Sequence, residues 1–326
     1  MLLRDIFSRL RRVQSLDLNA VDIDASLPSQ FADLDAELLP FSDLFPFPEL
    51  RELRLSSVIF NSRNDIMRLL AVFPRLCRLT ASELLWQGRG TNGTPLGPAE
   101  RESVPRMLIN LKALWISTSM RRSWSGQRIK RSFATADWAT YVADYRRLVL
   151  QLLHDTAPTV EQLCITTADS LAEVDSRLYT CVRDVKLLFR NLDSRSHLPF
   201  SAAAPTFLSR LASRDLTVLT LCFQVSMTWT NTNWSLVDWP AIDDVLVRLH
   251  RQNTDFKVIF RITCVVGNQP TLLGRCASSA DVAKGLTDFL PSATGTHVRV
   301  GVSAYSMTGP VFYISPSGEL LDEHSI

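Results

Sequence analysis

The sequence lacks the short motifs by which many hydrolases, zinc proteases and nucleotide-binding proteins are recognised. It contains no GxSxG elbow, no HExxH pair and no phosphate-binding P-loop. None of its five histidines lies three or four residues from another histidine or a cysteine, which excludes a helical metal pair. Because we also find no nucleophile with a neighbouring base, the sequence predicts a chain that is not an enzyme and that holds neither a metal nor a cofactor.

Cysteine is scarce, and its spacing indicates no framework. The six cysteines form no CxxC pair and no spacing typical of a zinc site or a disulfide scaffold. Cys77, Cys164 and Cys222 lie inside expected strands, where a free thiol packs as a small hydrophobic group. This usage fits a reducing compartment. The first residues, MLLRDIFSRLRRV, lack the apolar core and cleavage site of a signal peptide, so we expect a cytoplasmic or nuclear protein.

Long apolar runs and an excess of charge of one sign are missing as well. No run of about 18 apolar residues occurs, so we expect no membrane-spanning helix. The 35 basic and 33 acidic residues give a net charge of +2, which exerts no general pull on nucleic acid or an anionic membrane. With 46% hydrophobic and 21% charged residues, the composition is typical of a globular protein.

What the sequence does contain is a repeated strand pattern. The stretch FPELRELRLSSVIF at 47–60 returns as FPRLCRLTASELLW at 73–86, and both contain the pattern L-x-x-L-x-L. A looser copy, FKVIFRI, occupies 256–262, and HVRVGVSAY at 297–305 alternates like a last strand. Because the spacing between copies is irregular, we expect a strand-centred repeat with connectors of variable length. The seven clear copies begin at Val13, Leu50, Leu76, Leu111, Val160, Val182 and Leu216.

Helices are expected in several gaps between these strands. Apolar residues recur at helical spacing in five segments, and Ser62 is the expected N-cap of the first of them. Pro74 and Pro158 follow two of the helices, because proline cannot continue a helix. The expected helical segments are 62–73, 135–156, 205–214, 239–253 and 279–290.

The repeating unit is therefore a helix, a proline break and a short strand. One unit cannot bury its apolar face alone, so stacked units must share a continuous core. The sequence predicts one α/β domain over 1–326, an irregular leucine-rich-repeat-like solenoid with parallel strands on the concave side and helices on the outside. Clear repeats cover about 10–225 and a looser part covers 226–326. Loops are expected at 87–107 and 121–134.

The segment DIMRLLAVFPRLCRLTA at 65–81 resembles the leucine-rich-repeat region of fungal F-box proteins. There, FPxLxxLxL strand starts and DxxRLLxxFPxLxxLxL passages are common. The resemblance covers the rhythm of most of 10–265 and is specific over about 47–86. It implies a protein-binding module that recognises substrates for an SCF-type ubiquitin ligase and contacts ligase subunits. The alternative is a structural or orphan repeat scaffold with no link to a ligase.

The chain departs from that family pattern in two respects. No helical F-box segment opening with LPxE precedes Val13, so the resemblance implies a repeat region without its F-box. In addition, the regular repeat places Asn or Cys three residues after each copy, and the buried ladder that these residues form is missing here. That position holds Val21, Val58, Leu84, Ser119, Ala168, Arg190 and Gln224.

Two loop motifs have simple interpretations. Gly88, Gly90 and Gly93 spell GxGxxG, but the prolines that follow prevent the helix start that would hold a pyrophosphate, so we expect a surface loop. The basic residues of 121–131 surround Trp124, a combination that fits nucleic-acid contact, a localisation signal or a solvated loop. We expect no nucleic-acid binding, and a protein is the expected partner.

Residues between the apolar positions of each strand must point away from the core, since side chains alternate across a strand. The fifth positions are Asp17, Arg54, Thr80, Trp115, Cys164, Lys186 and Thr220, and the third positions are Ser15, Glu52, Arg78, Ala113, Gln162, Asp184 and Val218.

Trp115 is the outstanding member of these rows. A tryptophan on an outward strand face has no role in the core, and aromatic residues with arginines form interface hot spots. The alternative is that loop 121–133 or a long helix covers Trp115. We expect a protein partner to contact the concave face through Arg54, Arg78, Trp115, Lys186, Glu52 and Asp17.

Overall fold

The computed structural model shows two compact units, Met1–Thr159 and Val160–Ile326, and each is described by itself. The single-domain prediction for 1–326 stays a prediction. The GxGxxG motif, the basic cluster around Trp124 and both expected loops lie outside the described residues. The structure describes residues 12–20, 22–23, 45–60, 63–86, 110–117, 138–167, 171–190, 200–225, 237–264, 279–296, 298–304, 311–315 and 319–322.

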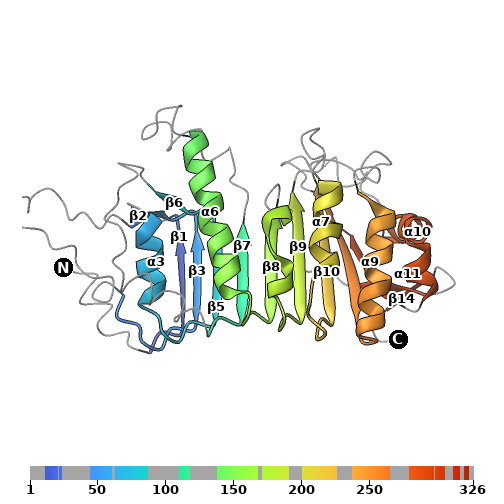
Figure 1. Ribbon diagram of the computed structural model, residues 1–326, viewed down its shortest axis with the longest axis horizontal. Coiled ribbons are helices and arrows are strands. Elements are labelled where there is room, and N and C mark those ends of the chain that lie inside the picture. The colour runs from blue at the N-terminus through green and yellow to red at the C-terminus, as the bar shows by residue number, and fades with distance from the viewer. Residues whose placement is uncertain are drawn as a thin grey trace, which may run out of the picture. The chain divides into compact units, whose positions relative to one another are not determined.

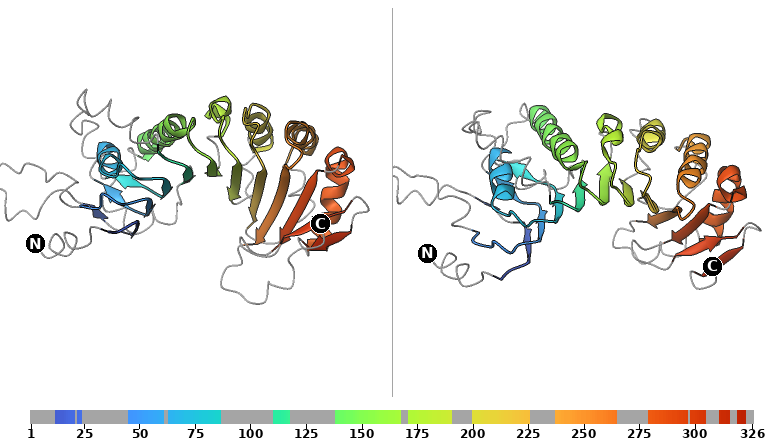
Figure 2. Two further views of the ribbon diagram at one scale, coloured as in Figure 1. Left: turned by 90° about the horizontal axis from the view of Figure 1, so that it is seen from below. Right: turned by 60° about the horizontal axis from the view of Figure 1, so that its bottom comes forward.

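The first unit is a parallel sheet with helices on one face (Figure 2). A second, smaller parallel sheet is formed by short strands that come directly after the first three strands of the main sheet in the chain. The helices are α3 (Arg63–Ala71) and α6 (Trp138–Thr156), as expected, whereas Ser62 lies outside the described residues. The main sheet has the order β1 (Ser15–Asn19), β3 (Glu52–Ser56), β5 (Arg78–Ser82), β7 (Ala113–Ser117), and the smaller one β2 (Asp22–Ile23), β4 (Ile59–Phe60), β6 (Leu85–Trp86).

The second unit continues the same α/β pattern, again with its helices on one face of its own sheet (Figures 1 and 2). Its first five strands are parallel and its last two antiparallel. The strands are β8 (Gln162–Thr167), β9 (Asp184–Arg190), β10 (Val218–Val225), β11 (Lys257–Cys264), β12 (Arg299–Ala304), β13 (Phe312–Ile314) and β14 (Leu320–Asp322). The helices are η4 (Leu171–Glu173), η5 (Ser176–Leu178), α7 (Phe200–Ser209), α9 (Trp239–Gln252), α10 (Ser279–Phe289) and α11 (Pro291–Gly295).

The prediction for one helix was wrong in position. A helix was expected over 205–214, but α7 runs from Phe200 to Ser209 and contains Pro205. The three alanines before the proline are the best helix formers and favour an earlier start of the helix. In the described part of the chain, no helix combines the length and the apolarity that crossing a bilayer requires.

The repeated apolar positions form the core. The strands pair so that equivalent residues are neighbours, as in Leu53 beside Leu79 and Leu79 beside Leu114, and all three are at most 2% exposed. The same alignment places Val185 beside Leu219 and Leu219 beside Val258 in the second unit. Burial of these side chains contributes about 1.5–3 kcal/mol each. Alternation thus predicted the core face of the strands correctly.

In most copies a backbone carbonyl at the second position joins neighbouring strands. The Gln14 carbonyl accepts the N–H groups of Arg51 and Glu52, both at 2.9 Å, and the Arg51 carbonyl accepts those of Cys77 and Arg78 at the same distance. In the second unit the carbonyls of Glu161 and Arg183 accept pairs of N–H groups in the same way. Backbone hydrogen bonds therefore fix the register at the start of each of these strands. They do so without a ladder of buried Asn or Cys side chains.

The two matching stretches at 47–60 and 73–86 also share their bend. Ser57 and Glu83 have φ angles of 55° and 54°, a left-handed conformation that is uncommon outside glycine, and the Ser57 hydroxyl donates to Glu83 Oε2 at 2.9 Å. The next residues, Val58 and Leu84, are buried. Apolar side chains thus fill the position that Asn or Cys holds in the regular repeat.

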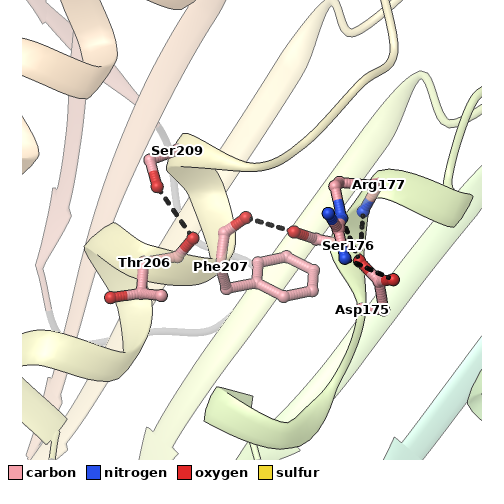
Figure 3. A network of polar contacts seen from close by, with 6 residues as sticks. All are labelled: Asp175, Ser176, Arg177, Thr206, Phe207 and Ser209. Atoms are coloured by element: carbon pink, nitrogen blue, oxygen red, sulfur yellow. Dashed lines mark hydrogen bonds and ion pairs between the residues drawn. The ribbon is translucent and has the colours of Figure 1, made fainter.

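Figure 3 shows how a carbonyl group at the end of α7 is satisfied by another segment. The buried Ser176 hydroxyl of η5 donates to the Phe207 carbonyl at 2.6 Å, and Arg248 of α9 donates to the Leu208 carbonyl at 2.7 Å. The last turn of a helix leaves such carbonyls without partners inside the helix. Side chains from η5 and α9 therefore anchor α7 in the helical layer of the second unit.

Candidate protein-binding surface

The candidate residues of the first unit share the sheet face on which the structure describes no helix, here called the first open face. Asp17, Arg54, Thr80 and Trp115 are direct neighbours on β1, β3, β5 and β7. Arg78 lies beside Glu52 in the adjoining row. The strand pairing brings these side chains onto one surface because parallel strands keep equivalent residues in register.

Trp115 is the most prominent side chain of this face. It is 42% exposed, whereas its strand neighbours Leu114 and Ile116 are each 1% exposed. The alternative that a long helix buries Trp115 is therefore wrong for the described helices, and loop 121–133 lies outside the described residues. An indole kept at the surface offers a large apolar contact area together with one hydrogen-bond donor.

Arg54 belongs to the same row of side chains as Trp115, and acidic neighbours hold its guanidinium group in place. Its Nε and Nη2 donate to Glu52 Oε1 at 3.0 and 2.8 Å. This hydrogen bond, the Glu52 charge and the more distant Asp17 charge raise the pKa of Arg54 above its usual value. Exposed ion pairs contribute little stability, so the contact mainly orients the guanidinium group.

The predicted site residues fall into two groups. Asp17, Glu52, Arg54, Arg78 and Trp115 lie together on the first open face. Lys186 lies on β9 of the second unit, on the corresponding helix-free face of that sheet.

Two of the outward fifth positions are nevertheless buried, since Cys164 and Thr220 are only 8% and 7% exposed. Both pair with Lys186, and Thr220 also pairs with Ile259, so longer neighbours shield these short side chains. The outward direction of a strand position therefore does not guarantee that water reaches it.

The sequence analysis missed several charged residues of the second unit. Lys257 and Arg261 on β11 and Arg299 on β12 share a helix-free face with Lys186 and Asp184. Burial raises the pKa of the Asp184 carboxyl, while Lys186 and Lys257 oppose this shift. The alternation that identified Lys186 as outward-facing also applies to these positions. They were not predicted because the third and fifth positions were considered only in the seven clear repeats, which end before β11.

The buried thiol of Cys222 on this face is expected to be unreactive. Burial raises its pKa to about 11 against the opposing effect of Lys186 and Arg261. Cys181, by contrast, is exposed. Iodoacetamide at pH 8 should therefore modify Cys181 in the native chain and leave Cys222 unmodified until the chain unfolds, because the thiolate is the reactive form. Peptide mass spectrometry measures both sites, and equal rates would contradict the burial of Cys222.

No metal site is found in the described segments, which contain no group of three His, Cys, Asp or Glu side chains that could hold an ion. The expected absence of a metal stays a prediction. No protein-family model and no curated protein matches the chain. The resemblance to F-box repeat regions therefore also stays a prediction.

Proposed function

We propose that this chain is a protein-interaction module that binds a partner on its first open face, around Trp115. The observation that carries the proposal is the exposed indole, 42% accessible, in one register row with Arg54 and close to Arg78 on β5. Tryptophan and arginine are the residues most enriched in interface hot spots. Glu52 and Asp17 add negative charge beside them, so the surface fits a partner that presents an apolar pocket with mixed charges at its rim.

In this proposal the two units are parts of an irregular leucine-rich-repeat-like solenoid with its strands on the concave side. The repeated apolar register, the parallel strands and the carbonyl contacts at the strand starts support it. By the resemblance of 65–81, the biological role is substrate recognition for an SCF-type ubiquitin ligase in the cytoplasm or nucleus. The chain itself performs no catalysis.

Replacing Trp115 with alanine should weaken partner binding at least about 30-fold, the effect of a hot spot of about 2 kcal/mol. The partner is first identified by affinity purification from the native cell with the unaltered chain, and its dissociation constant is then measured by calorimetry. Phe289→Ala is the matched control, because Phe289 is another exposed large hydrophobic residue, 38% accessible, but belongs to the second unit.

Three outcomes are distinguishable. Loss of binding with Trp115→Ala and retention with Phe289→Ala supports the proposed surface. Equal binding by both variants and by the unaltered chain would refute it. Co-purification of the ligase's adaptor subunit tests the ligase link separately, and its absence in cells where the partner is captured would leave an interaction module without that link.

A further inference from the structure

The sheet face of the second unit on which the structure describes no helix, here called the second open face, carries an excess of positive charge among its described side chains. Its members are the strand residues that alternate with the buried positions Val185, Leu219, Val258 and Val300. Among the side chains that the structure describes on β8 to β12 of this face, four are basic and one is acidic, a net charge of +3. They are Lys186, Lys257, Arg261, Arg299 and Asp184.

The sheet places two of these cations directly side by side. Lys257 on β11 pairs with Arg299 on β12 in the parallel register. Like charges at opposite positions of neighbouring strands destabilise a sheet. An anionic group from outside the chain would relieve this repulsion.

Packing around β13 helps to fix Lys257 in place. Its Nζ lies 6.0 Å from the centre of the Tyr313 ring, an arrangement in which the ring attracts the ammonium group. Gly301 permits this packing, because a Cβ atom there would lie 2.7 Å from Val311 Cγ1 and 3.3 Å from Tyr313 Cε1. Arg261, which lies on β11 like Lys257, donates from Nη1 to the buried Ser303 hydroxyl at 3.2 Å. These contacts restrict the movement of both side chains.

We propose that the second open face binds an acidic segment of a partner protein. From strand spacings, the basic groups span about 14 Å across β9 to β12 and about 13 Å along β11, the length of roughly four residues of extended peptide. Opposite charge is the complementarity that this face offers. The inference concerns a different unit from Trp115 and does not rest on the function proposed for the first open face.

Nucleic acid fits this face less well than an acidic peptide. Binding of single strands relies on aromatic rings on which bases can stack. Tyr313, the aromatic side chain that adjoins the basic residues, is only 4% exposed and already faces Lys257. Asp184 would also repel a dense row of phosphates. Carboxylates spaced along a peptide can contact the cations while avoiding Asp184.

Fluorescence anisotropy of a labelled hexaglutamate peptide, titrated with the full chain in 50 mM salt, tests the proposal. Lys257→Gln/Arg299→Gln should weaken binding about five- to tenfold, and Asp184→Asn should strengthen it about two- to threefold. Binding should also weaken markedly at 0.5 M salt, since ions screen exposed charges. The matched control is Arg210→Gln/Arg251→Gln, which removes two exposed positive charges from other parts of the same unit.

Equal weakening by the two double variants would show that net charge alone matters and would overturn the proposal. Absence of peptide binding by the unaltered chain would overturn it too. So would tighter binding of a hexanucleotide than of hexaglutamate, which would indicate a nucleic-acid surface. If sedimentation showed a dimer that only Lys257→Gln/Arg299→Gln dissociates, the occupant would be a second copy instead of an acidic partner. The Asp184→Asn variant keeps the test decisive if the double variant folds poorly.

Discussion

Replacing Phe223 with alanine is expected to lower the free energy of unfolding of the second unit by about 3–5 kcal/mol, the usual loss for a large aromatic side chain in a core. Phe223 lies on β10 and is 1% exposed. Its ring stacks on Phe189 with centroids 5.5 Å apart and on Phe260 at 6.4 Å, and it meets Trp239 of α9 at 6.2 Å. One substitution thus opens a cavity between three strands and a helix.

Phe289→Ala is the control for this cavity. Phe289 stacks on Trp239 with centroids 5.7 Å apart, yet it is 38% exposed, so its loss should cost less than about 1.5 kcal/mol. Hydrogen exchange resolved by mass spectrometry gives the opening free energy of β9, β10 and β11 without assuming that the two units unfold together. Equal losses in both variants would contradict the central position of Phe223.

The elements that could be predicted from the sequence are those set by local alternation. For Leu53 and Leu79, the apolar residue two positions further along each strand predicts which face is buried. Both leucines are buried in the structure. Trp115 was placed on the outer face by the same argument, and its exposure confirms it. The prediction succeeds here because the period of a strand depends on the chain within a few residues.

What could not be predicted depends on segments far apart in the sequence. Thr220 occupies an outward position, but Lys186 and Ile259 on the two neighbouring strands shield it. Gly301 shows no special role in the sequence until Val311 and Tyr313 are found packed against it. Such effects arise from the pairing partner and its side-chain length, which alternation along one strand does not contain.

The two open faces differ in the chemistry that they offer. The first combines an exposed indole with charges of both signs, as in the Arg54–Glu52 pair. The second has basic groups around a largely buried aromatic ring. Apolar burial supplies affinity and charge supplies selectivity and rate of association. Binding at the first face should therefore depend mainly on apolar burial and binding at the second mainly on charge, and variants of each face separate these two contributions.

Asp243 is the second position at which a large effect is expected. Helix periodicity along α9 does not distinguish Asp243 from its neighbour Asp244. Asp243 is 5% exposed, and its carboxylate accepts the backbone N–H groups of Ser292 at 2.9 Å and Ala293 at 2.7 Å. Leu290, the residue before α11, has no side chain that could cap this helix. An acid on α9 therefore caps a helix about fifty residues further along the chain, which no local pattern reveals.

Asp243→Ala should lower the free energy of unfolding of the second unit by about 3–5 kcal/mol, because it leaves two backbone donors without their charged acceptor. Asp244→Ala is the matched control. It removes the same charge from the exposed neighbouring position on the same helix, and its effect should stay within about 0.5 kcal/mol. Asp243→Asn keeps one acceptor oxygen and should fall between the two. Hydrogen exchange of the α11 amides ranks the three variants by their loss of protection. Similar protection of these amides in the Asp243→Ala and Asp244→Ala variants would show that the buried carboxylate does not hold α11 against α9.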